Sequence, residues 1–160
     1  MLSVVRFDKG FDRESFDCGV AVLNDFLKTR ASQYIKRYEA VVYCAFDDQT
    51  QKIAGFYTLS NTAICQADDP VLLKKQHPTA PIGCVLIGRL AVDKHYQGMG
   101  LGSDLLIHAL RTTKTLADMV GIAYVVVDAK DENAKRFYEK YGFKPISTNP
   151  MRLCYPVKNL

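Results

Sequence analysis

Two near-continuous apolar runs, with a helix-forming segment between them, restrict the folds that are open to this chain. The runs cover residues 84–92 and 122–127, and such runs are typical of strands that are covered on both faces. Between them, apolar residues recur at helical spacing from Leu101 to Ala117. The segment is therefore predicted to form a strand, a helix and a second strand, as in an α/β fold.

Similar patterns predict the other elements. A turn at 47–50 should join two strands into an antiparallel hairpin, and Gly121 and Gly142 should end the two later helices. Strands are expected at 3–7, 41–46, 53–63 and 151–157, and helices at about 20–37 and over a short stretch at 134–141.

Residues 64–83 are less regular. Pro70, Pro78 and Pro81, with Gly83, exclude one continuous element there, and the pattern allows a short helix at about 71–76. Pro156 places the last strand at an edge or marks its end. The resulting order, β-α-β-β-β-α-β-α-β, predicts a mixed sheet with helices packed on it, in a single domain over residues 1–160.

Composition and charge exclude several classes of protein. The 160 residues are 48% hydrophobic and 24% charged, so a disordered chain, a collagen and a coiled coil are excluded. The apolar runs are far shorter than the roughly 20 residues that span a bilayer. Charged residues within the first nine positions argue against a signal peptide, so a cytoplasmic protein is expected. The net charge of +4 permits a polyanionic partner without requiring one.

Cysteine and histidine spacing gives no sign of a disulfide or of a metal site. The five cysteines are far apart and form no C-x-x-C pair, which favours free, buried thiols in a reducing compartment. The three histidines share no zinc-ligand spacing, so no metal is expected.

The glycine-rich segment from Gln97 to Ser103 lies between the strand at 84–92 and the following helix. Alternating glycines allow unusual φ values, so backbone N–H groups can converge on one point. The start of the helix adds unsatisfied N–H groups and a partial positive charge. This arrangement predicts a cradle for an anion such as a pyrophosphate. It is not a dinucleotide fingerprint, because Ser103 replaces the third glycine, and it lacks the Gly-Lys of a Walker A loop.

Three motifs together resemble the GNAT acyltransferase superfamily. They are Arg89–Val92, the Q/R-x-x-G-x-G/A loop at Gln97, Gly100 and Gly102, and Asn133-Ala134 followed by Phe137–Phe143. The resemblance is strong over 84–145. It implies the GNAT fold: a mixed, mostly antiparallel sheet with a V-shaped splay between its central strands and helices on both faces.

The N-terminal part is similar to a narrower family, the tRNA-acetylating toxins of type II toxin–antitoxin modules. The similarity lies in Phe16–Gly19, followed by Leu23–Leu27, and in Gly88–Val92. It implies acetylation of the α-amine of aminoacyl-tRNA, which blocks translation. It also implies a ribbon-helix-helix antitoxin and a homodimer as partners.

The superfamily resemblance implies acetyl-CoA as the donor. Its pantetheine arm would pair with the backbone of Leu90, Ala91 and Val92 and accept a hydrogen bond from Asn133. Its pyrophosphate would lie on the amides of Met99, Gly100, Gly102 and Ser103, with Gln97 and Gly98 shaping the loop.

Tyr138 is the candidate general acid, because a phenol stays protonated at neutral pH and can donate to the departing sulfur. The alternative is a core aromatic, since Phe137 and Tyr141 share its helical stripe. No general base stands out among Asp68, Asp69, Asp93, His95 and Glu132. An α-amine, with a pKa of about 7.7–8.0, needs a base less than a lysine side chain does.

Basic residues could hold an RNA substrate, although each alone could equally belong to a solvated helix face. The candidates are Lys28, Lys36, Arg37, Arg89, Lys135, Arg136 and Lys140. Two other functions stay open: a GNAT enzyme for a small amine or a protein N-terminus, and a non-catalytic acyl-CoA-binding module.

Overall fold

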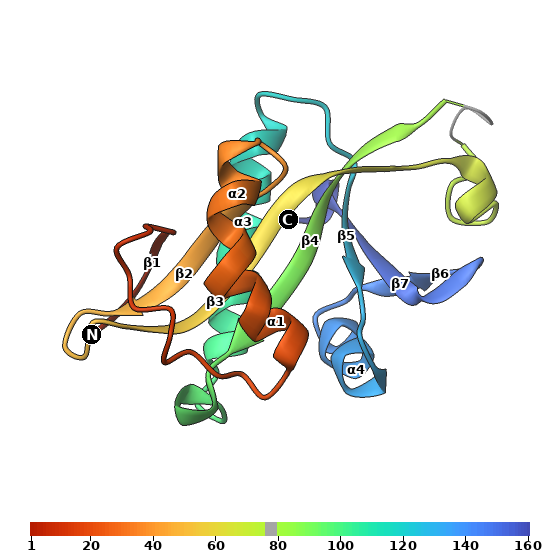
Figure 1. Cartoon of the computed structure of the whole chain (residues 1–160). Coiled ribbons are helices and arrows are strands. Elements are labelled where there is room, and N and C mark those ends of the chain that lie inside the picture. The colour runs from red at the N-terminus through yellow and green to blue at the C-terminus, as the bar shows by residue number, and fades with distance from the viewer. Residues whose placement is uncertain (76–79) are drawn as a thin grey trace. The chain divides into compact units, whose positions relative to one another are not determined.

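The computed structural model describes residues 1–75 and 80–160 (Figure 1). These residues form two compact units. The first unit contains residues 1–60 and 88–109, and the second contains residues 61–87 and 110–160. Strands β3 (Lys52–Ile64) and β4 (Ile82–Val92) and helix α3 (Leu101–Ala117) each continue from one unit into the other.

The strands form a seven-stranded mixed sheet in the order β1-β2-β3-β4-β5-β7-β6. β4 and β5 are parallel, whereas β1–β2, β2–β3, β5–β7 and β6–β7 are antiparallel. The open, mixed sheet with helices confirms the predicted fold class. The other strands are β1 (Leu2–Arg6), β2 (Val41–Asp47), β5 (Tyr124–Asp128), β6 (Lys144–Ile146) and β7 (Asn149–Pro156).

In the first unit, helices cover both faces of the sheet because side chains alternate along its strands. On one face, Phe56 of β3 packs with Phe16 and Phe26, next to α1 (Ala21–Asp25) and α2 (Ala31–Lys36). On the other face, the Tyr57 hydroxyl and His108 Nδ1 of α3 are hydrogen-bonded at 2.7 Å. Gly55 shares the α3 face, where an added Cβ would come within 2.9 Å of Leu105 Cδ1.

In the second unit, β5 is covered on both faces, as its apolar run predicts. Val125, Val126 and Val127 are all fully buried. Helix α4 (Glu132–Lys140) begins where the Asp131 side chain accepts a hydrogen bond from Ala134 N. It ends before Gly142, whose φ of 93° confirms the predicted glycine stop.

The predicted helix at 20–37 is interrupted. Residues Phe26–Arg30 form a π-helical turn between α1 and α2, in which Ala31 N donates to Phe26 O. An inserted residue of this kind leaves the apolar spacing largely intact, so the pattern indicates only one continuous helix.

The structure departs from the expectations at Gly121 and at β6, and it decides between the two alternatives for Pro156. Gly121 does not cap α3, because the helix ends at Ala117. The carbonyl oxygen of Gly121 instead lies 2.7 Å from the position that a Cβ on Gly83 would take. Strand β6 is missed, because three residues that include a proline carry no periodicity. It makes β7 an inner strand, so Pro156 marks the strand's end and not an edge.

The irregular region contains no helix over 71–75, where the chain forms turns, and residue 76 lies outside the described residues. A short 3-10 helix lies at Gln66–Asp68 instead.

All five cysteines are free, as predicted, and Cys44, Cys84 and Cys154 are buried. Burial raises the pKa of the Cys44 thiol to about 12 and that of Cys154 to about 11. No helix in the part of the chain that the structure describes is long and apolar enough to span a membrane.

Candidate functional site

The glycine-rich loop of the first unit has the backbone of an anion cradle. Gly98 and Gly100 adopt φ values of 83° and 80°, which side-chain-bearing residues rarely tolerate. A Cβ added at either glycine would meet no protein atom within 4 Å. Helix α3 begins directly after Gly100, whose carbonyl accepts from Asp104 N at 3.1 Å. The backbone N–H groups of Leu101 and Gly102 come before this first helical hydrogen bond, and the open space beside both glycines suits a diphosphate.

The Gln97 side chain connects this loop to two neighbouring backbone carbonyl groups. Its Nε2 donates to Val92 O at 2.9 Å and to Cys18 O at 3.3 Å. The side chain thus connects the end of β4 with the turn before α1. This position agrees with the loop-shaping role expected from the resemblance.

A set of hydrogen bonds, missed in the sequence, joins the Asp17–Gly19 turn to the segment after β4. Asp93 Oδ2 accepts from Asp17 N at 2.9 Å, and Lys94 N donates to Asp17 O at 2.8 Å. Asp17 Oδ1 accepts from Gly19 N at 2.8 Å and from Asn24 Nδ2 at 2.9 Å. The residues of the toxin-like N-terminal motif therefore hold the segment that leads into the glycine-rich loop.

The carboxylates of this network stay ionised. Hydrogen bonds from Gly19 N, Asn24 and Lys94 lower the pKa of Asp17 to about 2. Burial opposes ionisation of Asp93, but the N–H groups of Asp17 and His95 and the His95 ring together bring the pKa of Asp93 below its ordinary value. Asp93 is 5% exposed, and its Oδ1 accepts from His95 N at 2.8 Å.

Replacing Asp93 with Asn should weaken both the fold of the first unit and its binding of coenzyme A. The amide nitrogen of Asn would face one of the two backbone N–H groups, Asp17 N or His95 N, that donate hydrogen bonds to the carboxylate. An unsatisfied buried donor costs about 1–3 kcal/mol, which urea unfolding measures. Because folding lowers the pKa of Asp93, the ionised carboxylate stabilises the fold at pH values above its ordinary pKa of 3.8, and this stabilisation is lost as the pH falls further. The difference in free energy of unfolding between wild type and variant should therefore become smaller in acid.

Asp12→Asn is the matched control for this prediction. Asp12 is exposed and accepts from Glu14 N and from Ser15 Oγ within its own turn. Its replacement should change the free energy of unfolding by less than about 0.5 kcal/mol and leave coenzyme A binding unchanged. Equal losses in the two variants would contradict a specific role for Asp93.

The end of β4 contains Leu90, Ala91 and Val92, whose backbone is predicted to pair with a pantetheine arm. Ala91 is buried in the core with Phe16 and Phe26, while Leu90 and Val92 are half-buried. Asp93 N donates to Ala54 O at 2.8 Å, which holds the end of β4 against β3.

The second unit contains Tyr138 and Asn133. Tyr138 is 8% exposed and packs against Phe137 and Phe143, so it is also a core aromatic. Burial raises its pKa to about 12. Within residues 1–75 and 80–160, its hydroxyl makes no hydrogen bond to a protein atom. Asn133 is exposed, and its Oδ1 accepts from Arg136.

The basic candidates are divided between the units. Lys28 is half-buried in the π-helical turn, Lys36 and Arg37 are exposed at the end of α2, and Arg89 lies on β4, all in the first unit. Lys135, Arg136 and Lys140 lie on α4 in the second. Arg89 lies within β4, three residues before the last, and contacts aromatic rings.

Two of the possible bases are already engaged in structural contacts. Asp69 is 7% exposed and accepts from Leu72 N and Ser147 N. Asp93 accepts the hydrogen bonds described above. His95 is exposed, and its Nδ1 lies 3.0 Å from Asp93 Oδ1.

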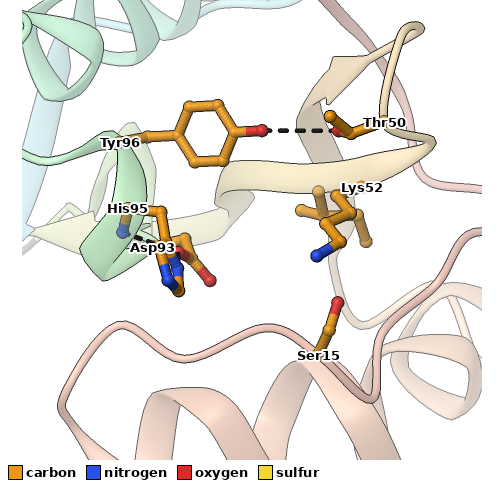
Figure 2. Close-up of a pocket in the computed structure, with 7 residues that line it drawn as sticks. Ser15, Thr50, Lys52, Asp93, His95 and Tyr96 are labelled. Atoms are coloured by element: carbon orange, nitrogen blue, oxygen red, sulfur yellow. Dashed lines mark hydrogen bonds and ion pairs between the residues drawn. The ribbon is translucent and has the colours of Figure 1, made fainter.

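A pocket of about 230 Å³ lined mainly by residues with polar side chains also lies in the first unit (Figure 2). The Tyr96 hydroxyl donates to Asp47 Oδ2 at 2.8 Å and lies 3.4 Å from Thr50 Oγ1. The Lys52 ammonium and the Ser15 hydroxyl point into the space between the labelled residues. No motif marks this pocket in the sequence, because its residues come from distant segments. Among the described residues, no group of three or more side chains could hold a metal ion.

Comparison with known families agrees with this geometry. Residues 38–145 match the family model of the acetyltransferase (GNAT) domain. The chain belongs to the GNAT acetyltransferase family and is an acyl-transferring enzyme.

Similar proteins within this family are toxins. A tRNA-acetylating toxin of Mycobacterium tuberculosis is 31% identical over 96% of this chain and 91% of its own length. A probable toxin TacT of Sinorhizobium fredii is 30% identical over 93% of this chain and 87% of its own.

Solved structures of toxins are also similar. AtaT complexed with acetyl-methionyl-tRNAfMet has a TM-score of 0.91 and 30% identity, covering 99% of this chain and 96% of that one. A KacT mutant has a TM-score of 0.92 and 31% identity over the same shares. AtaTR bound with acetyl-CoA has a TM-score of 0.84 and 29% identity, covering 99% of this chain and 94% of that one.

Proposed function

We propose that this enzyme transfers an acetyl group from acetyl-CoA to the α-amine of aminoacyl-tRNA and thereby stops translation. The observation that carries the proposal is the similarity to a tRNA-acetylating toxin over 96% of the chain. The likeness to AtaT complexed with an acetylated aminoacyl-tRNA supports the same acceptor. The glycine-rich loop supports the same donor, because its backbone suits a diphosphate.

Acetyl-CoA supplies a thioester, and transfer forms the amide C–N bond, breaks the C–S bond and leaves the thiolate of coenzyme A. The loop amides around Gly98 and Gly100 would hold the diphosphate, with Met99, Gly102 and Ser103 contributing amides and Gln97 fixing the loop. The backbone of Leu90, Ala91 and Val92 would pair with the pantetheine arm, and Asn133 would donate to it.

Tyr138 would assist departure of the sulfur. Its hydroxyl, with a pKa of about 12, stays protonated at physiological pH. It can therefore donate a hydrogen bond to the developing thiolate, or the proton itself. An amine proton released on amide formation balances this donation, so no net proton is required from the protein.

The absence of an assigned base agrees with an α-amino acceptor. Asp69 and Asp93, both buried, are held by backbone N–H groups in structural roles. An α-amine has a pKa of about 7.7–8.0, so a substantial fraction is neutral near pH 7.5 without help. A lysine side chain, at about 10.4, is almost wholly charged there.

The pH dependence of kcat/KM should show an acid limb and no alkaline limb below about pH 9.5. The acid limb reports deprotonation of the acceptor amine, at or below about pH 8. An alkaline limb is absent because Tyr138, at about 12, remains protonated. Initial rates with aminoacyl-tRNA from pH 6 to 9.5, corrected for ester hydrolysis, test this. A decline that begins near pH 9 would contradict the role given to Tyr138.

We further propose that residues 1–160 form a single catalytic domain, that the enzyme is a cytoplasmic homodimer, and that a ribbon-helix-helix antitoxin binds it and covers its surface. Strands β3 and β4, which continue through both units, support the single domain. Free thiols and a tRNA acceptor support the compartment. AtaT bound to its antitoxin AtaR is a similar structure, which supports the antitoxin. The dimer follows from the resemblance alone.

One experiment separates the proposed acceptor from its alternative. The purified chain is incubated with radiolabelled acetyl-CoA and either charged tRNA, uncharged tRNA, or a panel of small amines and peptide N-termini. Label on charged tRNA alone supports the proposal. Label on amines or peptides but never on charged tRNA would identify a different GNAT enzyme.

A further inference from the structure

Arg89 lies on a platform of two aromatic rings in the first unit. Its Cζ is 3.8 Å from the centroid of the Phe26 ring and 5.2 Å from that of Tyr34. The two rings meet edge to face, with centroids 5.2 Å apart and an interplanar angle of 79°. Phe26 is fully buried and Tyr34 is half-buried, so the rings fix the guanidinium from one side.

The π-helical turn at Phe26–Arg30 creates this platform. Phe26 and Tyr34 are eight residues apart, which in an α-helix would separate them by about 80° around the axis. One additional residue in the turn gives them the relation of residues seven apart, about 20°. The interruption therefore narrows the angle between the two side chains and aligns both rings along one line of the segment. Turns of this kind occur frequently at functional sites.

Among the residues that the structure describes, the Arg89 guanidinium has no acidic partner. Among residues 1–75 and 80–160, no carboxylate lies within 4.0 Å of Arg89, although this side chain is half-buried. Burying a cation is costly unless an anion or hydrogen bonds compensate, and aromatic faces compensate only part of the cost. With one face on Phe26, the N–H donors at the edge of the planar guanidinium remain for an anion that presents two oxygens, such as a phosphodiester.

We propose that Arg89, held by Phe26 and Tyr34, binds a phosphodiester at the 3′ end of the acceptor RNA. The inference rests on the proposed function and assigns a substrate subsite to one residue. Arg89 directly precedes Leu90–Val92, the backbone expected to hold the pantetheine arm. An anion on Arg89 would therefore lie close to the acyl donor, where the phosphodiester of the terminal nucleotide is the nearest negative charge on an aminoacylated RNA. Lys28, in the same π-helical turn as Phe26, adds positive charge.

Two short acceptors isolate the phosphate. Aminoacyl-adenosine carries the reactive amine without a phosphate, and the aminoacylated dinucleotide CpA adds one phosphodiester. The wild-type enzyme should use the dinucleotide with a KM about ten- to hundredfold lower, as expected for a charge-assisted contact. Arg89→Gln should remove most of this difference, because it raises the KM for the dinucleotide far more than the KM for aminoacyl-adenosine, which has no phosphate.

Salt dependence gives a second readout that a structural role would not change. Binding of full-length charged tRNA should weaken linearly on a log–log plot against salt concentration. Arg89→Gln should reduce the slope by about 0.7–0.9, the value for one phosphate contact. Arg89→Lys should keep the slope but lose affinity, because an ammonium does not form the two-point contact. Calorimetry with coenzyme A and urea unfolding show whether each variant is folded and binds the donor.

Arg30→Gln is the matched control. Arg30 belongs to the same π-helical turn but is exposed and lies 3.5 Å from Asp25 Oδ2. Its replacement should preserve the preference for the dinucleotide. The inference is overturned if folded Arg89→Gln retains that preference and the salt slope, while the wild type acetylates charged tRNA. A wild-type enzyme that acetylates no charged RNA would instead overturn the proposed function. If Arg89→Gln does not fold, Arg89→Lys decides: an unchanged tRNA affinity in that variant overturns the inference as well.

Discussion

Tyr138→Phe should lower kcat for acetyl transfer by about 10²–10⁴-fold while leaving the affinity for coenzyme A nearly unchanged. The substitution removes only the hydroxyl, and the ring would continue to pack against Phe137 and Phe143. Because that hydroxyl makes no hydrogen bond among the described residues, its loss leaves no protein group unsatisfied. Single-turnover rates with acetyl-CoA and calorimetry with coenzyme A separate the two effects.

Tyr141→Phe is the appropriate control, since Tyr141 belongs to the same stripe of α4 and its C-terminal end and is half-buried. Its rate should stay within about threefold of the wild type, equivalent to less than about 0.7 kcal/mol. A fully active Tyr138→Phe variant would show that Tyr138 is only a core aromatic and not the general acid. A stable variant that binds coenzyme A without transferring acetyl would also exclude a non-catalytic binding module for the wild type.

Residue periodicity was sufficient to predict the sheet and its helices because these elements bury long apolar stripes. The strand at 122–127 illustrates this: Val125, Val126 and Val127 are buried, as a run without alternation indicates. Helix α3 spans the predicted residues Leu101–Ala117 for the same reason. Elements without such stripes, such as β6, leave no comparable pattern.

The candidate site was predictable only where one contiguous segment forms it. Gly98 and Gly100 lie in one loop, and their positive φ values agree with the conformational freedom inferred from their spacing. The contacts of Asp93 with Asp17, and of Arg89 with Phe26 and Tyr34, join segments tens of residues apart. Pairing across such distances follows from strand order and register, which no local pattern encodes.

The π-helical turn shows why the stacked arginine could not be inferred from sequence. In an uninterrupted helix Phe26 and Tyr34 would be about 80° apart around the axis, so the two rings would not align along one line of the helix beneath Arg89. The sequence does place Arg89 within the apolar run at 84–92, and a basic residue there permits either a solvated or a buried position. The structure provides a third arrangement, with the cation supported by rings and its edge available.

Replacing both Gly98 and Gly100 with Ala should weaken coenzyme A binding by about 30- to 1,000-fold. Each alanine at a positive φ costs about 1–2 kcal/mol, and every 1.4 kcal/mol is tenfold in affinity. No protein atom lies within 4 Å of either added Cβ, so the free loop can relax and the cost appears on binding. Calorimetry with coenzyme A measures the loss, and urea unfolding should show little change in stability.

Gly142→Ala is the control, because this glycine-to-alanine substitution should lower stability and leave coenzyme A affinity unchanged. Gly142 has a φ of 93°, but its added Cβ would lie 3.1 Å from Tyr155 Cε2, so packing prevents relaxation. Its cost should therefore appear in the free energy of unfolding, with coenzyme A affinity retained. If the Gly98 and Gly100 double variant instead binds coenzyme A like the wild type, main-chain amides of this loop do not hold the diphosphate. The acetyl donor would then need another site, because the proposed roles of Leu90–Val92 depend on the same bound molecule.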